Sequence, residues 1–572
     1  MKIKHLFGLA VIAAMTASCS SNEDLGTAGP GTGTNETGVG YATFTINLPS
    51  VSGTRAVDAG GAEMNEGTAK EYAVKSATAL IFQKYGSDEG SYKFVESVDL
   101  PTAAADWTDD TTDGITTTKK LVAKLTNVDT KNQYYVLVLL NNNKTGGVKV
   151  PLPTVGQSYN EWNSQILSPS VDDLAADNDF YMANAPLKGT ASPTTLVTIN
   201  KENIYSSKEK AEAGTSAATV YVERGVAKMS VNDPKTKTVI DKATNNPTKS
   251  TVEFNNWALD ITNKKTYAVH NIDGLSTDFP DIWTTPRFIG TNSRVYWGKD
   301  PNYNLDNLNT GKEAEREKEF NFIKAISGIN KTFAESAYCL ENTFNLANMY
   351  QGQTTRVIFK ATYTPMDAAG NPLADKDGTF YTIGNMTTIL KAEALETAVN
   401  TAATSVFPGC TVDYTNLKQE GSHVITLADI KDSTGKTLVA DKDYSGKTGT
   451  VIVKDINDKL GLIDGAGHAE AMVGINTYAQ GVTYYIARVK HFGSLTPWNS
   501  GESYGDNNLK YLGRYGMLRN NWYDLTVGNV YGPGYPGVPP VDPNQPDDEN
   551  EKYLSVSVKI LSWAKRSDTV DL

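Results

Sequence analysis

The chain has very little cysteine, the residue that could cross-link it through disulfides. The 572-residue chain has three, at positions 19, 339 and 410. Three cysteines are too few for a disulfide scaffold. Cys339 and Cys410 stand in the apolar surroundings Ala-Tyr-Cys-Leu and Phe-Pro-Gly-Cys-Thr-Val, so we expect buried free thiols. A single bridge between these two residues is the alternative.

Long apolar runs and clusters of basic residues are also missing. Beyond residue 19 no apolar run approaches the roughly 18 residues that a transmembrane helix needs. The net charge of -12, without a clustered Lys/Arg run, excludes nucleic acid and an anionic membrane surface as partners. Only 39% of the residues are apolar, and there are 48 glycines and 23 prolines. This composition favours a large β-rich extracellular protein of two domains over an enzyme core.

Motifs for catalysis or cofactor binding are absent or incomplete. Gly501-Glu-Ser-Tyr-Gly505 matches a nucleophile elbow, but the segment before it is a loop and no helix follows. Asp375-Lys-Asp-Gly378 is similar to a calcium loop, yet Thr379 occupies a ligand position, so a surface turn is expected. No Walker or Rossmann motif occurs. The histidines lack the spacing of zinc ligands: His5, His270, His423, His468 and His491. We therefore predict no catalytic site, no metal and no cofactor.

The N-terminus has the pattern of a bacterial lipoprotein signal. Residues 1–4 carry lysines, residues 6–15 are apolar but too few to span a bilayer, and Thr16-Ala-Ser-Cys19 is a small-residue cleavage site. The Cys19 thiol would take a diacylglyceryl group, and buried acyl chains anchor a protein to a membrane. A plain secretory signal with an incidental cysteine is the alternative. Residues 20–40 are rich in Gly and Thr and are interpreted as a tether.

Two strands with similar alternation stand near the two ends of the chain. In residues 41–48 the apolar set is Ala42, Phe44, Ile46 and Leu48. In residues 553–563 the apolar set is Leu554, Val556, Val558 and Ile560, followed by Trp563. Side chains alternate with period two, so each set occupies one face. The two segments could fill one position in a sheet in turn, which predicts polymerisation by strand exchange. An edge strand of its own domain is the alternative for the C-terminal segment.

The C-terminal segment has both the energy and the reach for such an exchange. Four large apolar side chains at roughly 1.5–3 kcal/mol each would contribute about 6–12 kcal/mol before ordering costs. The preceding residues 536–552 are rich in Pro and Asp and form a linker that could extend to a neighbouring subunit. The C-terminal strand should enter the vacant sheet position with Leu554, Val556 and Val558 facing inward, because a slip by one residue would bury Lys559.

Arg55 has a distinctive position. It is the first arginine of the chain, the next is Arg224, and lysines are frequent between them. It lies in a Ser/Gly/Thr-rich stretch that a protease could thread as extended chain. This placement suits an arginine-specific cut between Arg55 and Ala56. An ordinary solvated loop arginine is the alternative.

Strand patterns dominate the rest of the chain, without βαβ alternation or a fixed repeat. The fold class is therefore predicted as mainly β, with two β-sandwich-like (transthyretin-like) domains, a few short helices and a C-terminal donor strand. Helices are expected at 311–326 and 388–406. Strands are expected at 41–48, 72–83, 92–100, 119–126, 134–140, 195–199, 218–231, 252–260, 356–364, 449–454, 481–490 and 522–530.

The predicted organisation runs from signal to donor strand. Its parts are a signal peptide over 1–19, a propeptide over 20–55 that holds the first strand, domains over 56–240 and 250–535, the linker over 536–552, and the donor strand over 553–572.

With these features the chain resembles a known family, the fimbrial subunits (type V pilins) of Bacteroidales, and among them the minor-fimbrium shaft subunits. The resemblance runs along nearly the whole chain, and its termini are the most specific. It is carried by the lipobox at Cys19, Gly53-Thr-Arg55-Ala56, Tyr221-Val-Glu-Arg-Gly-Val-Ala-Lys228, Tyr338-Cys-Leu-Glu-Asn-Thr343, Asn521-Trp-Tyr-Asp-Leu-Thr-Val527 and Leu554-Ser-Val-Ser-Val-Lys-Ile-Leu-Ser-Trp563.

The resemblance implies a pathway of assembly. A lipidated precursor would reach the outer membrane, an arginine-specific protease would cut after Arg55, and loss of the first strand would open a groove. The C-terminal strand of another subunit would enter that groove, and repetition would build a homopolymer. Implied partners are anchor and tip subunits and host or bacterial surface receptors, in adhesion and biofilm formation. The rivals are a tip or anchor subunit and a monomeric surface lipoprotein that binds glycans.

Overall fold

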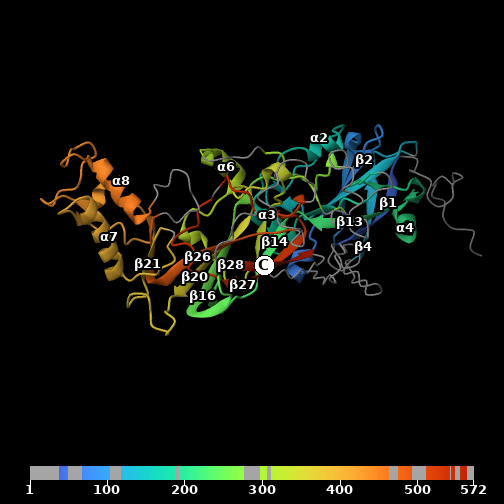
Figure 1. Ribbon diagram of the computed structural model, residues 1–572. Helices are drawn as coiled ribbons and strands as arrows, with labels where there is room; N and C mark the ends of the chain where they lie inside the picture. The colour runs from blue at the N-terminus through green and yellow to red at the C-terminus, as the bar shows by residue number, and fades with distance from the viewer. Residues whose placement is uncertain are drawn as a thin grey trace, which may run out of the picture.

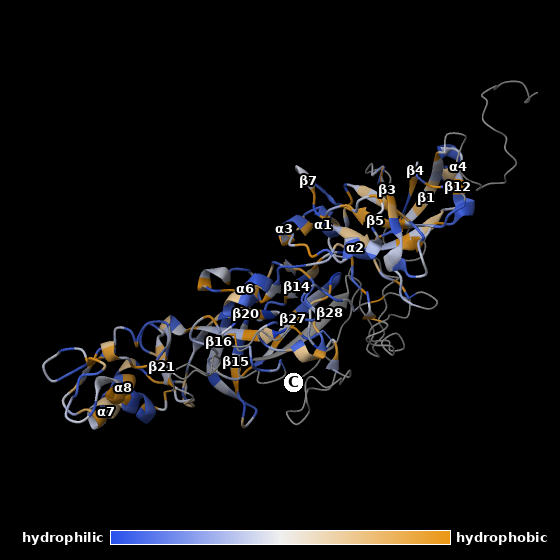
Figure 2. Ribbon diagram, turned by 90° about the horizontal axis from the view of Figure 1, so that it is seen from above, coloured by the Kyte–Doolittle hydropathy of each residue, from blue (hydrophilic) through white to orange (hydrophobic). Residues whose placement is uncertain are grey.

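The computed structural model describes residues 38–48, 67–102, 118–129, 131–188, 192–275, 295, 297–305, 311–384, 386–462, 474–491, 511–541, 543–547 and, for the backbone alone, 554–562. Their fold is mainly β, with several sheets and a few short helices, as predicted. Three parts follow one another along an elongated body, as Figure 1 and Figure 2 show. The first sheet lies at one end, the second sheet in the middle, and a lobe with α7 and α8 at the other end.

The first sheet has nine strands among the described residues. Its main path runs in the order β12 (Ile204–Tyr205), β1 (Gly40–Asn47), β13 (Ala218–Arg224), β10 (Met182–Asn184), β5 (Tyr134–Leu140), β2 (Ala77–Gln83) and β3 (Lys93–Leu100). β11 (Val197–Thr198) pairs with β5, and β4 (Thr118–Leu125) pairs with β1. Around it lie α1 (Ala69–Tyr72), α2 (Tyr159–Asn163), α3 (Val171–Leu174), α4 (Lys208–Ala213), and the short pairs β6 (Asn143–Lys144) with β7 (Gly147–Val148) and β8 (Ala175–Ala176) with β9 (Asp179–Phe180).

The second sheet has eight strands in the part of the chain that is described. Its main path is β19 (Ala337–Cys339), β14 (Ala227–Val231), β27 (Asn521–Val530), β15 (Thr236–Asp241), β16 (Asn246–Asp260), β20 (Arg356–Thr364) and β26 (Val482–Arg488). β28 (Leu554–Ser562) pairs with β27. Beside the sheet lie α6 (Glu313–Glu319) and the pair β17 (Thr262–Asn263) and β18 (Phe320–Asn321).

A small lobe, called the helical lobe, is inserted between β20 and β26. It contains α7 (Ala392–Val406) and α8 (Gly449–Leu460), with the sheet β21 (Phe380–Ile383), β25 (Ile475–Tyr478) and β23 (Gly421–His423). β22 (Thr411–Val412) pairs with β24 (Ile430–Lys431). The lobe has a core of its own, built on Leu395, Val399, Ile452 and Ile456 from the two helices.

The prediction of a strand at 449–454 is wrong, because this segment begins helix α8. The β-branched run Val451-Ile-Val453 favours a strand, but the buried residues Ile452, Ile456 and Leu460 recur every four residues, which is the spacing of one helix face. The Thr448 side chain caps the start by accepting from the Val451 amide at 3.4 Å, and Gly461 ends the helix in a left-handed conformation.

The other predicted elements fall on observed ones, with shifted ends. The helix expected at 311–326 is the shorter α6, and the one expected at 388–406 is α7. The strand expected at 218–231 is divided into β13 and β14, which belong to different sheets. The chain thus passes from the first sheet to the second near residue 225, ahead of the boundary predicted between 240 and 250.

A buried cluster of charges joins the two sheets. The Glu71 carboxylate of α1 lies 2.6 Å from the Lys228 ammonium of β14 and accepts a hydrogen bond from the Tyr338 hydroxyl at 2.7 Å. Burial raises the pKa of Glu71, but Lys228, the Thr68 amide and Tyr338 lower it by more, so the pKa lies below its ordinary value. The Lys228 ammonium also lies 3.8 Å from the ring centroid of Trp522 on β27. Helix α1 is therefore tied to the second sheet.

Candidate functional site

β1, the strand predicted to be displaced, lies inside the first sheet. β4 pairs with it antiparallel along its whole length, from Gly40 with Leu125 to Asn47 with Thr118. On its other side β13 pairs parallel with residues 44–47, and β12 pairs antiparallel with residues 41–42. In the described part of the chain, β1 is the one strand hydrogen-bonded to β4. Loss of β1 would therefore leave two unpaired rows of backbone groups facing each other.

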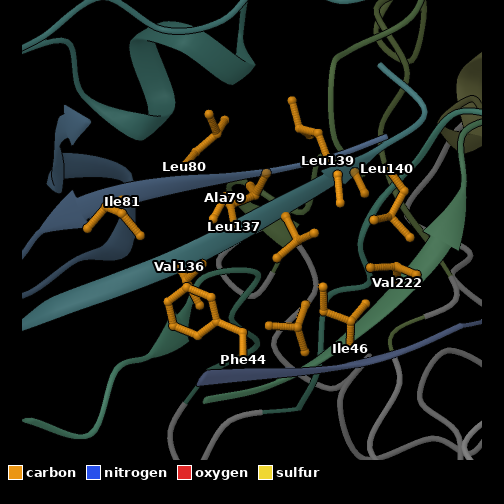
Figure 3. Packing of buried hydrophobic residues seen from close by; sticks show 14 of the residues in the cluster. Phe44, Ile46, Ala79, Leu80, Ile81, Val136, Leu137, Leu139, Leu140 and Val222 are labelled. Atoms are coloured by element: carbon orange, nitrogen blue, oxygen red, sulfur yellow. The ribbon is translucent and has the colours of Figure 1, made fainter. Parts of the chain in front are cut away.

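The even-numbered face of β1 is part of the core. Ala42, Phe44 and Ile46 are fully buried and Leu48 is 3% exposed. In Figure 3, Phe44 and Ile46 point from β1 toward side chains of β2 and β5, among them Val136 and Leu137. Burial of Phe44, Ile46 and Leu48 contributes about 1.5–3 kcal/mol each. These side chains thus fill a part of the hydrophobic core of the first sheet.

The opposite face of β1 carries threonines with specific partners. The Thr43 hydroxyl donates to the Ala211 carbonyl of α4 at 2.7 Å, and Thr45 and Ser216 share a hydrogen bond of 2.7 Å between their hydroxyls. At the end of the strand, the Thr118 hydroxyl donates to the Asn47 side-chain oxygen at 2.7 Å. These polar contacts help to fix the register of β1 in the sheet.

The other N-terminal residues predicted as functional, Cys19, Arg55 and Ala56, lie outside the described residues. A property of the remaining arginines bears on them. Every arginine that the structure describes is buried, with at most 4% of its surface exposed: Arg224, Arg316, Arg356, Arg488, Arg514 and Arg519. Arg287, Arg294 and Arg566 also lie outside the described residues. An arginine-specific protease would thus find none of the six described arginines at the surface.

The predicted donor segment forms β28, which lies on β27 of its own second sheet. The pairing is antiparallel, from Asn521 with Ser562 to Val530 with Leu554. The predicted inward set Leu554, Val556, Val558 and Ile560 is in register with Val530, Val527, Leu525 and Tyr523, the buried residues of β27. Trp563 lies outside the described residues. The segment is thus an edge strand of its own domain in this structure, which is the alternative named in the sequence analysis.

The residues before β28 are bound to the body. We call residues 531–547, of which 542 is not described, the strap. At its start the Tyr485 hydroxyl donates to the Gly532 carbonyl at 2.8 Å, and Tyr484 and Tyr535 exchange backbone hydrogen bonds of 2.9 and 2.7 Å. Gly534 has a φ of +66°, and a Cβ there would lie 2.5 Å from the Tyr484 carbonyl oxygen, so only glycine fits.

A buried arginine holds the middle of the strap. The Arg356 guanidinium donates to the carbonyls of Pro539 at 2.7 Å and Pro540 at 2.9 Å. It is also paired with the buried Asp260 carboxylate at 2.9 Å. Further along, the strap approaches Gly352 so closely that a Cβ there would lie 2.8 Å from the Pro543 Cβ. Proline carbonyls in an apparently free linker are therefore acceptors for a charged group in the core.

The last described residue of the strap, Asp547, is its most buried anchor. The residue is 2% exposed, and its carboxylate accepts from the Thr354 hydroxyl at 2.5 Å. The Asp547 amide donates to the Met349 carbonyl at 3.1 Å, and the Tyr515 hydroxyl donates to the Asp547 carbonyl at 3.3 Å. Over 536–547 the predicted linker thus lies against the second sheet. The sequence reasoning missed these anchors because nothing local in a Pro/Asp-rich stretch marks Asp547 as buried.

The remaining candidate residues lie in the core or in a turn. Cys339 and Cys410 are buried and unpaired, as predicted, and burial raises the pKa of the Cys339 thiol to about 12. Asp375 to Gly378 form the predicted turn, and the Asp375 carboxylate accepts from the amide of Ala392 at the start of α7. No group of three His, Cys, Asp or Glu that could hold a metal occurs within the described ranges. Within the same ranges, every helix is too short or too polar to cross a bilayer.

Comparison with known proteins identifies the C-terminal region. Residues 476–569 match the family described as "Major fimbrial subunit protein type IV, Fimbrillin, C-terminal". The match includes β25, β26, β27, the strap and β28. No curated protein matches the sequence.

Several solved structures are similar in outline. A candidate cell adhesion protein from Parabacteroides distasonis is 9% identical, with 92% of this chain and 98% of that one covered, at a TM-score of 0.36. A fimbrial assembly protein from the same species is 13% identical, with 61% and 93% covered, at a TM-score of 0.27. The tip fimbrial protein Mfa3 from Porphyromonas gingivalis, truncated at its C-terminus, is 10% identical, with 92% and 100% covered, at 0.28. At these TM-scores the likeness assigns no role to this chain.

Proposed function

We propose that this chain, a fimbrial subunit whose C-terminal region belongs to the fimbrillin family, is a structural subunit of the fimbrial shaft. It is exported as a precursor lipidated at Cys19 and cut between Arg55 and Ala56. The cut releases β1, and the C-terminal strand of the next subunit takes its place. The subunit has a structural role at the cell surface and no catalytic one.

The observation that carries this proposal is the position of β1. An inner strand with paired neighbours on both sides and a fully buried apolar face contributes to the core of its domain. A strand with that role is followed within a few residues by the one arginine of the first 223 residues. A cut there separates β1 from the rest of its domain in covalent terms while its hydrogen bonds still hold it. Replacement by a strand of equal alternation restores both the ladder and the core.

The burial of the other described arginines supports a selective cut. A protease needs an extended, accessible segment in its active site, and folded arginines of 0–4% exposure do not provide one. The fold thus keeps Arg224 and the five other described arginines away from such a protease.

Two rival roles make different demands. A tip or anchor subunit would lack one of the two strands, the displaced strand or the donor strand. An anchor would also keep its lipid. A monomeric glycan-binding lipoprotein would need neither Arg55 nor a detachable strand. The presence of an inner first strand, an arginine after it and an alternating C-terminal strand favours the shaft.

The test is replacement of the cleavage site with a change of specificity. Arg55→Lys keeps the charge but removes the arginine, so we expect a lipid-anchored precursor at the outer membrane and no filaments. In a second variant, residues 52–57 are replaced by the recognition sequence of a sequence-specific protease. Filaments should then form only when that protease is added. Filaments of normal length on cells with Arg55→Lys, with residues 20–55 still attached by mass spectrometry, would contradict the proposal.

A further inference from the structure

The strap has more anchors than a spacer requires. Its anchors are distributed along its length. They are the backbone hydrogen bonds of Tyr535, the hydrogen bonds from Arg356 to two proline carbonyls, and the buried Asp547 carboxylate. None of these contacts involves β28, so departure of β28 from β27 breaks none of them. The strap and the strand that follows it are separate in their attachment to the body.

We propose that the strap stays on the body during assembly and that Asp547 is the pivot from which β28 is passed to a second copy of this chain. The inference rests on the proposed function, since it assumes that β28 leaves β27. Its partner is the β1 slot of the neighbouring copy. The side of the body that holds Asp547 then lies toward the first sheet of that copy.

The number of residues between Asp547 and β28 limits how far β28 can lie from Asp547. From Asp547 to Leu554, residues 548–553 can span about 25 Å at most. If the strap came off from residue 531 onward, the same arithmetic gives about 80 Å. With the strap fixed, the neighbour's slot must therefore lie within about 25 Å of Asp547. Because β27 and β28 lie in the middle of the elongated body and the slot lies at one end (Figure 2), successive subunits overlap rather than meet end to end.

A disulfide across the strap tests the proposal. Tyr350 and Pro546 form an antiparallel bridge, with Gln351 donating to the Gln545 carbonyl at 3.0 Å and Asp547 donating to the Met349 carbonyl at 3.1 Å on either side. Residues at such a non-hydrogen-bonded position have Cα atoms about 4.5 Å apart, within the range of a disulfide. The precursor with Tyr350→Cys and Pro546→Cys is purified, divided into oxidised and reduced samples, and treated with an arginine-specific protease beside the wild type.

Polymer is scored as ladders on gels run without boiling. Oxidised and reduced samples should give the same ladders. Ladders from the reduced sample only would overturn the fixed strap and leave the proposed function intact. Absence of ladders from the cleaved wild type as well would contradict the proposed function itself.

A length variant gives an independent measurement that does not depend on the disulfide. Deletion of residues 549–551 leaves a reach of about 14 Å with the strap fixed, against about 70 Å with the strap detached. We expect the ladders to be lost on this deletion and retained when the same three residues are replaced by Gly-Ser-Gly. Full ladders from the deletion variant would overturn the proposal unless the oxidised disulfide variant also gives full ladders, in which case the neighbour's slot lies within about 14 Å of Asp547.

Discussion

At the scale of single residues, arginine and lysine are distributed differently between the interior and the surface of the described part of the chain. The described arginines are buried in ion pairs and hydrogen bonds, as with Arg356 on Asp260 and Arg519 on Glu341 at 3.1 Å. Lysines carry the exposed positive charge, for example Lys442, whose side chain is 55% exposed. Arginine suits the buried positions because its planar group binds several acceptors at once. The same choice keeps the arginines out of reach of an arginine-specific enzyme.

This reasoning predicts the outcome of moving one arginine to the surface. Lys442→Arg keeps the charge in an exposed loop of the helical lobe, so the fold and its stability should change by no more than about 0.5 kcal/mol. Digestion with an arginine-specific protease should now give a fragment boundary after residue 442, which mass spectrometry detects. Lys442→Gln is the matched control and should give none. If Lys442→Arg resists the protease as the wild type does, accessibility is not what spares the other arginines.

At the scale of elements, one strand, β28, must fit two positions in the proposed assembly, the edge beside β27 and the β1 slot of a second copy. In its own sheet Val558 is in register with the buried Leu525, and Ser557 is in register with the exposed Thr526. In the β1 slot the inward positions are Phe44 and Ile46, and the opposite face includes Thr43, which is 1% exposed, and the half-buried Thr45. The two positions thus share the alternation of an apolar inward face, whereas the opposite face is more covered in the β1 slot than at Thr526.

Aspartate substitutions on the two faces should have unequal effects. Val558→Asp would bring an unpaired charge toward an apolar core at a cost of several kcal/mol in either position. We expect it to release β28 from β27 in the precursor and to abolish polymer ladders after cleavage. Ser557→Asp should leave both the precursor's melting temperature and the ladders within error of the wild type. Equal loss of ladders in the two variants would contradict the register.

The elements also show what sequence patterns could and could not predict. β1, β5 and β20 were predictable because alternation or continuous apolar character is local, and a buried strand requires it. α8 was missed because the β-branched Val451 to Val453 outweighed the four-residue spacing of Ile452, Ile456 and Leu460. The strap was read as free linker because its fixation depends on Arg356, far away in sequence. Its proline carbonyls carry no pattern that reveals a distant donor.

At the scale of the whole molecule, the chain holds one strand that fills its own slot and one that lies at a sheet edge. β1 is paired on both sides, whereas β28 pairs with β27 alone among the described strands. In the proposed assembly, the uncleaved precursor keeps β1 in its slot and β28 on β27, so neither the slot nor the donor strand would be available to a second copy. In the proposed exchange, the vacated slot would offer pairing on two sides where β27 offers it on one. The exchange would then be favoured because the new position allows more backbone hydrogen bonds than the old one.

This difference predicts which amides change protection on assembly, as measured by hydrogen exchange on the filament and on the Arg55→Lys precursor. The β27 amides that point toward β28 should exchange faster in the filament, because every donated strand has left β27. The amides of β4 and β13 that face β1 should remain protected in both states, because a donated strand replaces β1. The α8 amides serve as the internal control and should not change. If β27 stays protected while β4 becomes exposed, the C-terminal strand has instead been swapped onto the β27 of a neighbour, and the slot of β1 is not its destination.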